Sequence, residues 1–166
     1  MNGTFEAQYA EPQHEAAFFY GLFLRGTGGG AFVPRKLAIP HLSDVEGNGI
    51  YYCLPSFEPL RGKRVLIVGG GNSAVDWALS LEGIASEVTL CHRMYKWQAH
   101  EAMVHRLLAS SVRVKYPYYT IKEVLGEDGV TGAVIWNERS GLEETIAVDA
   151  IVLSIGMLTN IEPFRE

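Results

Sequence analysis

The sequence predicts an α/β fold, in which a parallel sheet carries helices on both faces and an antiparallel β-meander is inserted before the last strand. Three observations support this prediction. An apolar run at 64–68 leads through a glycine turn into a helical pattern, and a second short run, 87–91, follows that helix. The segment 150–155 is almost continuously apolar, as expected for a strand buried on both faces of a sheet.

Length and charge limit the function classes. The chain has 166 residues, enough for one ordinary domain, and a net charge of −5, which argues against nucleic acid as a partner. No apolar run approaches the roughly 20 residues needed to span a bilayer, so we expect no membrane partner. Cys53 and Cys91 lie far apart and lack metal-site spacing, which predicts reduced thiols, no metal site and a cytoplasmic protein.

The first sixty residues give weaker signals. Residues 1–25 stay unassigned, although 18–24 have the composition of a buried strand. A glycine cluster at 26–30 precedes Pro34 and Pro40 and not a helix, so it indicates a bend. We therefore expect residues 26–62 to form a connector and residues 63–160 to form the main domain.

The turn after the first apolar strand has the pattern Gly-x-Gly-x-x-Ala. Gly69 allows a tight turn, Gly71 lets a phosphate approach the backbone, and Ala74 lets the helix pack close to its strand. Such a turn can be plain architecture, but its position between a strand and a helix favours a nucleotide pyrophosphate. The predicted pyrophosphate site consists of Gly69, Gly70, Gly71, Asn72, Ser73 and Ala74.

The helix after this turn has several expected features. Asn72 or Ser73 can cap it, and Asp76 is expected in its first turn. Gly83 is expected to end it. Its predicted apolar face comprises Ala74, Trp77, Ala78 and Leu81.

A basic cluster follows the second strand. This position, about twenty residues after the glycines, is where a dinucleotide fold contacts the adenosine ribose. The chain has His92, Arg93 and Lys96 there and no acidic residue before Glu101, which predicts NADPH in preference to NADH. Arg93 and Lys96 could instead be solvated loop charges, and His92 could be an ordinary surface histidine.

The remaining segments complete a Rossmann-like order. A helix is predicted at 97–108 and a strand at 112–116, and glycine-containing turns at 126–129 and 139–141 separate three further strands. The helix should bury Met103, Val104, Leu107 and Leu108, with His100 and His105 solvated; the meander strands are predicted at 121–125, 130–137 and 143–148.

Several of these motifs together resemble a known family. Residues 63–77, the basic cluster, residues 99–101 and residues 154–156 resemble the NADPH domain of pyridine nucleotide-disulfide oxidoreductases of the thioredoxin-reductase type. Within that family, the likeness is greatest to bacterial ferredoxin (flavodoxin)–NADP reductases. It covers roughly residues 26–160, and 28–37 resemble the segment where such chains leave the FAD domain.

The resemblance implies a cofactor, partners and further site residues. It implies NADP(H), with NAD(H) also possible, hydride transfer to FAD, and ferredoxin or flavodoxin as the partner of the parent enzyme. Ile155 and Gly156 would pass near the nicotinamide half, and Gln98 would border the adenosine site. No side chain resembles a general acid or nucleophile, so we expect no catalytic residue in this chain.

Two departures from the family keep alternatives open. Met94 and Gln98 hold positions where relatives carry arginine, which weakens selectivity for NADPH and favours a non-catalytic NAD(P)(H)-binding module. Thioredoxin reductases carry Cys-x-x-Cys where this chain has Cys53-Leu54-Pro55-Ser56. A thioredoxin-reductase-like disulfide reductase is therefore a less favoured alternative, and Cys53 is expected to be a small buried hydrophobe.

The resemblance also implies a missing FAD domain. The family's two FAD motifs are not found, so we expect a fragment in which 26–62 include the exit from the FAD domain and 161–166 begin the return to it. Alone, it should bind nucleotide but neither hold FAD nor turn over. An uncovered apolar face with Phe32, Tyr51, Tyr52 and Phe57 should then cause self-association.

Overall fold

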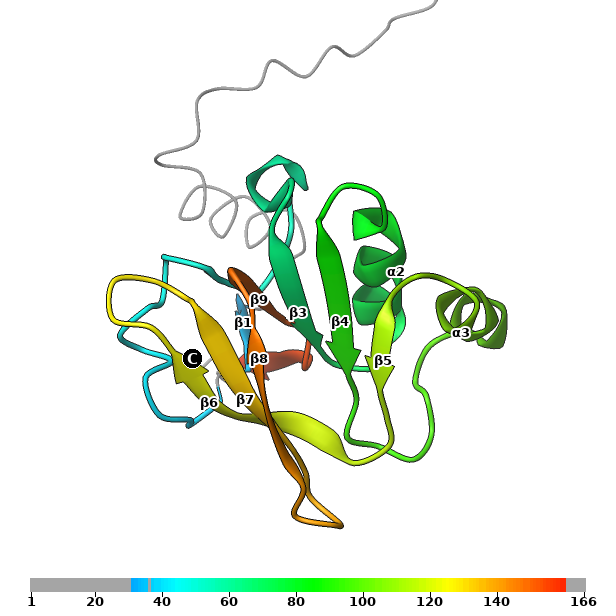
Figure 1. The fold of residues 1–166 in the computed structure, drawn as a ribbon. Coiled ribbons are helices and arrows are strands. Elements are labelled where there is room, and N and C mark those ends of the chain that lie inside the picture. The colour runs from blue at the N-terminus through cyan, green and yellow to red at the C-terminus, as the bar shows by residue number, and fades with distance from the viewer. Residues whose placement is uncertain (1–30, 36, 161–166) are drawn as a thin grey trace, which may run out of the picture. The chain divides into compact units, whose positions relative to one another are not determined.

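The computed structural model describes residues 31–35 and 37–160 (Figure 1). The predictions for residues 1–25, for the glycine cluster at 26–30 and for 161–166 lie outside these residues. One compact unit comprises Pro34–Gly156. A separate two-stranded sheet pairs β1 (Ala31–Pro34) with β10 (Met157–Asn160).

The compact unit is built on a five-stranded parallel sheet with the order β2-β9-β3-β4-β5. This confirms the predicted fold class. Both β3 and β4 have the predicted bounds, because each is a short run rich in β-branched and apolar residues. The strands are β2 (Ile50–Tyr51), β3 (Arg64–Val68), β4 (Glu87–Cys91), β5 (Arg113–Lys115) and β9 (Ala150–Leu153).

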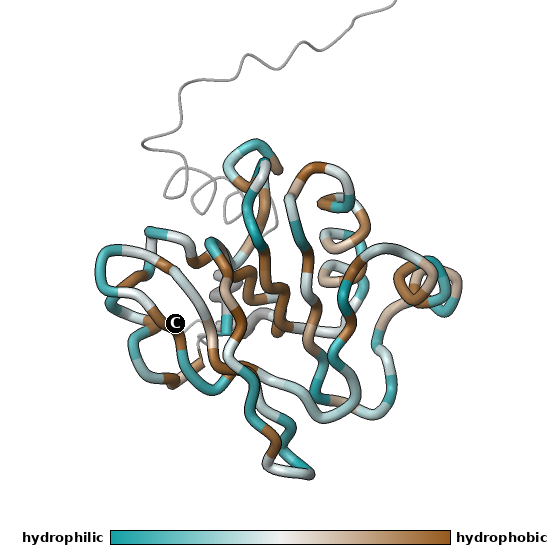
Figure 2. The backbone as a smooth tube through the Cα atoms, viewed as in Figure 1, coloured by the Kyte–Doolittle hydropathy of each residue, from teal (hydrophilic) through white to brown (hydrophobic). Residues whose placement is uncertain are grey.

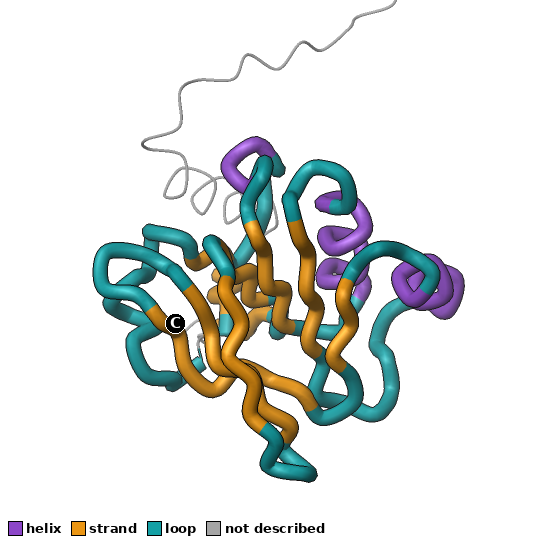
Figure 3. Tube along the Cα trace, viewed as in Figure 1, coloured by secondary structure: helices purple, strands orange, loops and turns teal. Residues whose placement is uncertain are grey.

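The two faces of this sheet are covered differently. Val65 and Ile67 pack with α2 (Asn72–Leu81), α3 (Glu101–Leu108) and the 3₁₀ helix η1 (Glu58–Leu60). Leu66 and Val68 pack with the meander on the other face, so the prediction of helices on both faces is corrected in this detail. Figure 2 shows the apolar run along β3, and Figure 3 shows both long helices beside the same sheet.

The meander confirms the predicted insertion. It comprises β6 (Tyr119–Leu125), β7 (Gly132–Asn137) and β8 (Glu143–Ala147), which pair antiparallel in that order. Alternation directs Ala133 and Ile135 of β7 into the core beneath the meander, and a register shift between Ile121 and Glu123 lets both Ile121 and Val124 of β6 point there too. These four apolar side chains take the place on this face that a helix was expected to fill.

Helix α2 differs from the prediction at its start. Gly71 is the N-cap and no side chain caps the helix, because Asn72 Oδ1 accepts a hydrogen bond from the His100 N–H at 2.8 Å. Asp76 lies in the second turn and is exposed, so it is not the first-turn acid expected. Gly83, with φ +81°, follows the C-cap Glu82, as predicted.

Helix α3 begins at Glu101, later than predicted. The residues before it form a loop, in which the Gln98 N–H donates to the Gly70 carbonyl at 3.0 Å. Val104 and Leu107 are buried as expected, but Leu108 is 59% exposed. The prediction began the helix too early because the apolar residues Trp97 and Ala99 precede its true start.

The predicted connector contributes to the same core. Leu42, Val45 and Ile50 are buried, and β2 adds a strand beside β9. Tyr51, Tyr52 and Phe57 are half-buried against the two core clusters, so they do not form the open apolar face expected of them. The division at residue 62 stays a prediction about the parent protein.

An ion pair joins the start of β3 to the residue before β9. Arg64 donates to Asp149 through Nη2 at 2.5 Å, Nε at 3.0 Å and the backbone N–H at 2.8 Å. These bonds lower the pKa of Asp149 to about 2. The carboxyl is therefore stabilised as the anion in the folded state.

Replacing Asp149 by Asn is expected to lower the free energy of unfolding at pH 7 by about 1 kcal/mol, a value reduced by solvent screening of an exposed pair. Because the folded-state pKa is depressed, this contribution is present above about pH 4 and is lost as the pH falls toward 2. Urea unfolding at both ends of this range measures it. Glu58→Gln, in an exposed pair with Arg61, is the control and should not shift the midpoint; equal midpoints for wild type and Asp149→Asn would contradict the assignment.

Candidate dinucleotide-binding site

The glycine turn joins β3 to α2 at the carboxyl ends of the parallel strands. At Gly69, φ is +150°, and a Cβ would lie 2.2 Å from the Ser154 carbonyl oxygen and 3.3 Å from Ala74 Cβ. The Gly69 N–H donates to the Cys91 carbonyl at 3.0 Å. Glycine is therefore required here both by conformation and by the close approach of β9.

The space in front of Gly71 is open. A Cβ at this position would meet no atom of the described residues within 4 Å. The backbone N–H groups of Gly71 and Ser73 find no acceptor among the residues that the structure describes, and both lie at the start of α2. Unpaired donors at the N-terminus of a helix favour an anion such as a phosphate.

A basic turn, defined as residues 92–98, lies beside the glycine turn. Its backbone is tied down at several points: Tyr118 N–H donates to Arg93 O at 3.1 Å, Tyr116 Oη donates to Tyr95 O at 2.6 Å, and Gln98 N–H donates to Gly70 O. The structure thus brings together two segments that the sequence assigned to one ligand.

Arg93 and Lys96 are exposed on the basic turn. None of the ion pairs found between described residues involves either side chain. Gln98 is exposed as well, and its backbone pairs with Gly71 as an isolated bridge. Two exposed cations that make no ion pair with any described residue, on a turn bonded to the glycine turn, are suited to a ligand with two separate phosphates.

His92 differs from one of the two predictions made for it, and its place among the cofactor-binding residues stays a prediction. It is only 3% exposed, so it is not a surface histidine, and it lies against Gly70 and not in the open space. Its ring stacks with Tyr116 at a centroid distance of 6.0 Å and lies tilted by 30° against Trp97 at 4.8 Å. Burial lowers the pKa of His92, which favours the neutral ring.

The end of β9 borders the glycine turn. The Ser154 N–H donates to the Val68 carbonyl at 2.8 Å, next to Gly69. Ile155 is half-buried against the core, and Gly156 is exposed with φ +93°. These predicted site residues therefore leave the sheet at the same edge as the glycine turn.

The sequence analysis missed Trp97 and Tyr116 as parts of this region. The sequence gives no spacing signal for them, since they come together only through the pairing of β4 with β5. Cys53 is exposed, which corrects its assignment as a buried residue. Cys91 is buried, and burial raises the pKa of its thiol to about 12.

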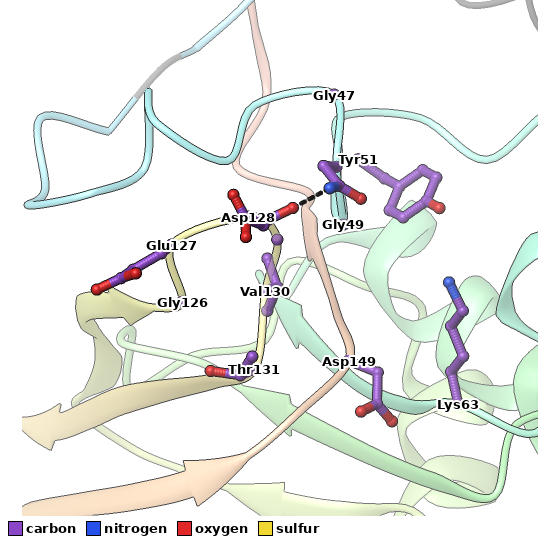
Figure 4. Close-up of a pocket in the computed structure, with 12 residues that line it drawn as sticks. Gly47, Gly49, Tyr51, Lys63, Gly126, Glu127, Asp128, Val130, Thr131 and Asp149 are labelled. Carbon is purple, nitrogen blue, oxygen red and sulfur yellow. Dashed lines mark hydrogen bonds between the residues drawn. The ribbon is translucent and has the colours of Figure 1, made fainter.

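Other sites in the described part of the chain offer less. The described residues contain no cluster of side chains suited to a metal ion, and none of their helices is long and apolar enough to cross a membrane. A hollow of about 660 Å³ includes Lys63, Asp149 and the loop 126–131 (Figure 4). It lies at the amino ends of β3 and β9, the opposite edge of the sheet from the glycine turn.

Comparison with known proteins agrees with this geometry. Residues 32–125 match the pyridine nucleotide-disulphide oxidoreductase family. The ferredoxin–NADP reductase of Geobacillus thermodenitrificans is 42% identical over 139 residues, which cover 84% of this chain and 42% of that protein. The ferredoxin–NADP reductase 2 of Chloroherpeton thalassium is 38% identical over 169 residues, which cover 99% of this chain and 48% of that protein.

Solved structures show the same fold. The thioredoxin reductase of Lactococcus lactis is similar with a TM-score of 0.71 and 28% identity, over 76% of this chain and 42% of that one. The chain thus spans less than half the length of the curated relatives it matches. With the family match over more than half of its residues, this chain belongs to the pyridine nucleotide-disulphide oxidoreductase family.

Proposed function

We propose that this chain is the NADPH-binding portion of a flavin-dependent oxidoreductase of the ferredoxin–NADP reductase type. The observation that supports this most directly is the open space at Gly71, next to a turn that carries the exposed cations Arg93 and Lys96 and is bonded to Gly70 through Gln98. The resemblance of the most similar curated relatives, which are named ferredoxin–NADP reductases, points to the same class.

The residues present fit a dinucleotide. The glycine turn, residues 69–74, holds the pyrophosphate, and the small Gly71 leaves the room that a phosphate needs. Arg93 and Lys96 bind the 2′-phosphate, and Ile155 and Gly156 border the nicotinamide half. A bound NADPH supplies a hydride for a flavin, and the flavin in the parent protein passes electrons to ferredoxin or flavodoxin.

The residues of this chain position the nucleotide, and the cofactors carry out the redox chemistry. Residues 63–160 form the nucleotide domain, and 26–62 and 161–166 connect it to the FAD domain of the parent. We place the protein in the cytoplasm. Light scattering tests the expected self-association, and a clean monomer at high concentration would contradict it.

Binding is tested by titrating NADPH and NADH while following tryptophan emission. Trp97 lies half-buried next to His92, so its emission should change when the basic turn is occupied. NADPH is expected to bind about 10–100-fold more tightly than NADH, because the 2′-phosphate adds charge-assisted contacts with Arg93 and Lys96. Trp97→Phe identifies the reporter, and a lack of binding by both nucleotides would contradict the proposal.

A turnover assay tests whether the 166-residue chain is active without a flavin domain. With NADPH and an artificial electron acceptor, the 166-residue chain should show no diaphorase activity without flavin, because it holds no hydride acceptor of its own. Appreciable activity without added flavin would contradict this division of roles. Flavin reduction by a longer protein that includes this chain would support the enzyme over a non-catalytic NAD(P)(H)-binding module.

The thiols argue against a disulfide reductase that works within this chain. The sequence contains Cys53 and Cys91, and both are free. Burial raises the pKa of both thiols, most strongly at Cys91. A dithiol exchange needs two accessible thiols, one of them ionised, and these two cysteines do not provide that.

A further inference from the structure

Three aromatic rings form a cluster behind the glycine turn. The centroid distances are 4.8 Å for His92 to Trp97, 5.0 Å for Trp97 to Tyr116 and 6.0 Å for His92 to Tyr116. His92 and Trp97 belong to the basic turn, while Tyr116 directly follows β5. The cluster therefore fixes the basic turn to the sheet.

The His92 ring also touches the glycine turn. A Cβ at Gly70 would lie 2.1, 2.2 and 2.4 Å from three atoms of this ring, Nδ1, Cε1 and Cγ. The φ of Gly70 is not in the left-handed region. Glycine is thus needed at this position for the room that the ring occupies and not for its backbone conformation.

The hydrogen bond of the His92 ring defines which ring nitrogen carries the proton. Nε2 lies 3.1 Å from the Lys96 carbonyl oxygen, and because a carbonyl only accepts, the proton is on Nε2. Nδ1 is then the unprotonated nitrogen that faces Gly70. Burial lowers the pKa of His92, the hydrogen bond to the Lys96 carbonyl opposes this, and the neighbouring Arg93 cation adds to the lowering, while Trp97 and Tyr116 bring neutral rings to it.

We propose that His92 is a positioning residue for the dinucleotide, and that its neutral ring holds Gly70 and the basic turn in the arrangement that binds phosphate. This role rests on the proposed function. His92 does not contact the ligand; it acts through the Gly70 backbone and the Lys96 carbonyl. A second proton would sit on Nδ1 and place an N–H and a positive charge against the Gly70 backbone, which disturbs that contact, while Nε2 donates to the Lys96 carbonyl in either protonation state.

The direction in which ligand binding shifts the pKa of His92 distinguishes this role from direct phosphate binding. A ligand that prefers the neutral ring lowers the pKa of His92, and acidification weakens binding by at most tenfold per pH unit. A histidine that binds phosphate directly shows the opposite, a raised pKa and tighter binding in acid. ADP-ribose is the suitable probe, because it lacks the 2′-phosphate, which itself titrates near pH 6.

The first experiment follows the His92 ring by NMR in the 166-residue chain, with and without saturating ADP-ribose, from pH 5 to 8. The expected result is an Nε2–H tautomer whose pKa falls when ligand binds. An unchanged or raised pKa overturns the proposal. If wild-type protein binds neither ADP-ribose nor NADPH, the proposed function fails first, and the positioning role fails with it.

Variants test the same point through affinity. His92→Gln keeps an amide that can donate to the Lys96 carbonyl but cannot titrate, so its ADP-ribose affinity should lose the acid-dependent decrease seen in wild type. His105→Gln is the matched control, because His105 is exposed on α3 and should retain the wild-type profile. The proposal is overturned if wild type and His92→Gln have the same profile.

A double-mutant cycle tests the contact with Gly70. Gly70→Ala should weaken ADP-ribose binding at least tenfold in wild type, because the new methyl group displaces the ring. In a His92→Ala background the same methyl group has room, and Gly70→Ala should then change affinity less than twofold. Equal effects in both backgrounds would show that the ring does not position the turn.

Discussion

Replacing Gly69 by Ala is expected to lower the free energy of unfolding by about 2–4 kcal/mol and to abolish nucleotide binding. The new Cβ would lie 2.2 Å from the Ser154 carbonyl oxygen, which belongs to backbone and cannot rotate away. The φ of +150° adds conformational strain. Relief requires that β3 and the end of β9 separate, and this also moves Ile155 and Gly156. Urea unfolding and NADPH titration measure the two effects.

Gly71→Ala is the matched control for this prediction. The added methyl group would meet no described atom within 4 Å, and the φ of Gly71 is −87°, which alanine adopts freely. We expect a loss of stability of only about 0.5–1 kcal/mol, since alanine is a poorer N-cap than glycine. Nucleotide affinity should nevertheless fall at least tenfold, because the methyl group occupies the place of the phosphate. If Gly71→Ala binds NADPH as wild type does, the pyrophosphate site is not at this turn.

The strands could be predicted well because their signals are local. In β3 and β4 a few consecutive β-forming residues end at a glycine turn or a basic cluster, and no distant residue is needed to define them. The same is true of the meander, where turn residues separate alternating apolar residues. The order of these elements was enough to predict the fold class.

The features that the sequence could not predict depend on distant contacts. The start of α3 is set by the pairing of Gln98 with Gly70, which lie 28 positions apart. The burial of His92 depends on Tyr116, which the chain brings back through β5. Helices lie on one face only because the meander residues fill the other, a choice that periodicity in a single helix cannot reveal.

The hollow at the amino ends of the strands does not compete with the candidate site. It is open and lies at the edge where Lys63 and Asp149 precede their strands, and Asp149 is already paired with Arg64 (Figure 4). The carboxyl edge instead carries the glycine turn and unpaired cations. In open α/β sheets ligands bind at this carboxyl edge. The glycine turn is therefore the better candidate for the ligand site, although the hollow is the larger space.

Arg93→Gln is expected to weaken NADPH binding by about 10–100-fold while leaving NADH affinity within about twofold. A guanidinium contact to a 2′-phosphate contributes about 1.5–3 kcal/mol, and NADH has no phosphate at that position. Lys96→Gln should give the same selectivity with a smaller loss, since an ammonium group makes a less directional contact. Arg61→Gln is the control: it removes one exposed cation at the other edge of the sheet and should not alter the ratio of the two affinities.

Met94→Arg tests the same assignment by gain of affinity. Met94 is 47% exposed on the basic turn, so an arginine there need not disturb the core. It would supply the second guanidinium that the family resemblance implies at this position, and it should raise the preference for NADPH over NADH by about tenfold. In an Arg93→Gln background the gain should persist in part, because two neighbouring cations share one phosphate. If neither Arg93→Gln nor Met94→Arg changes the ratio of NADPH to NADH affinity, residues 93–96 do not bind the 2′-phosphate, and any nucleotide preference arises outside this turn.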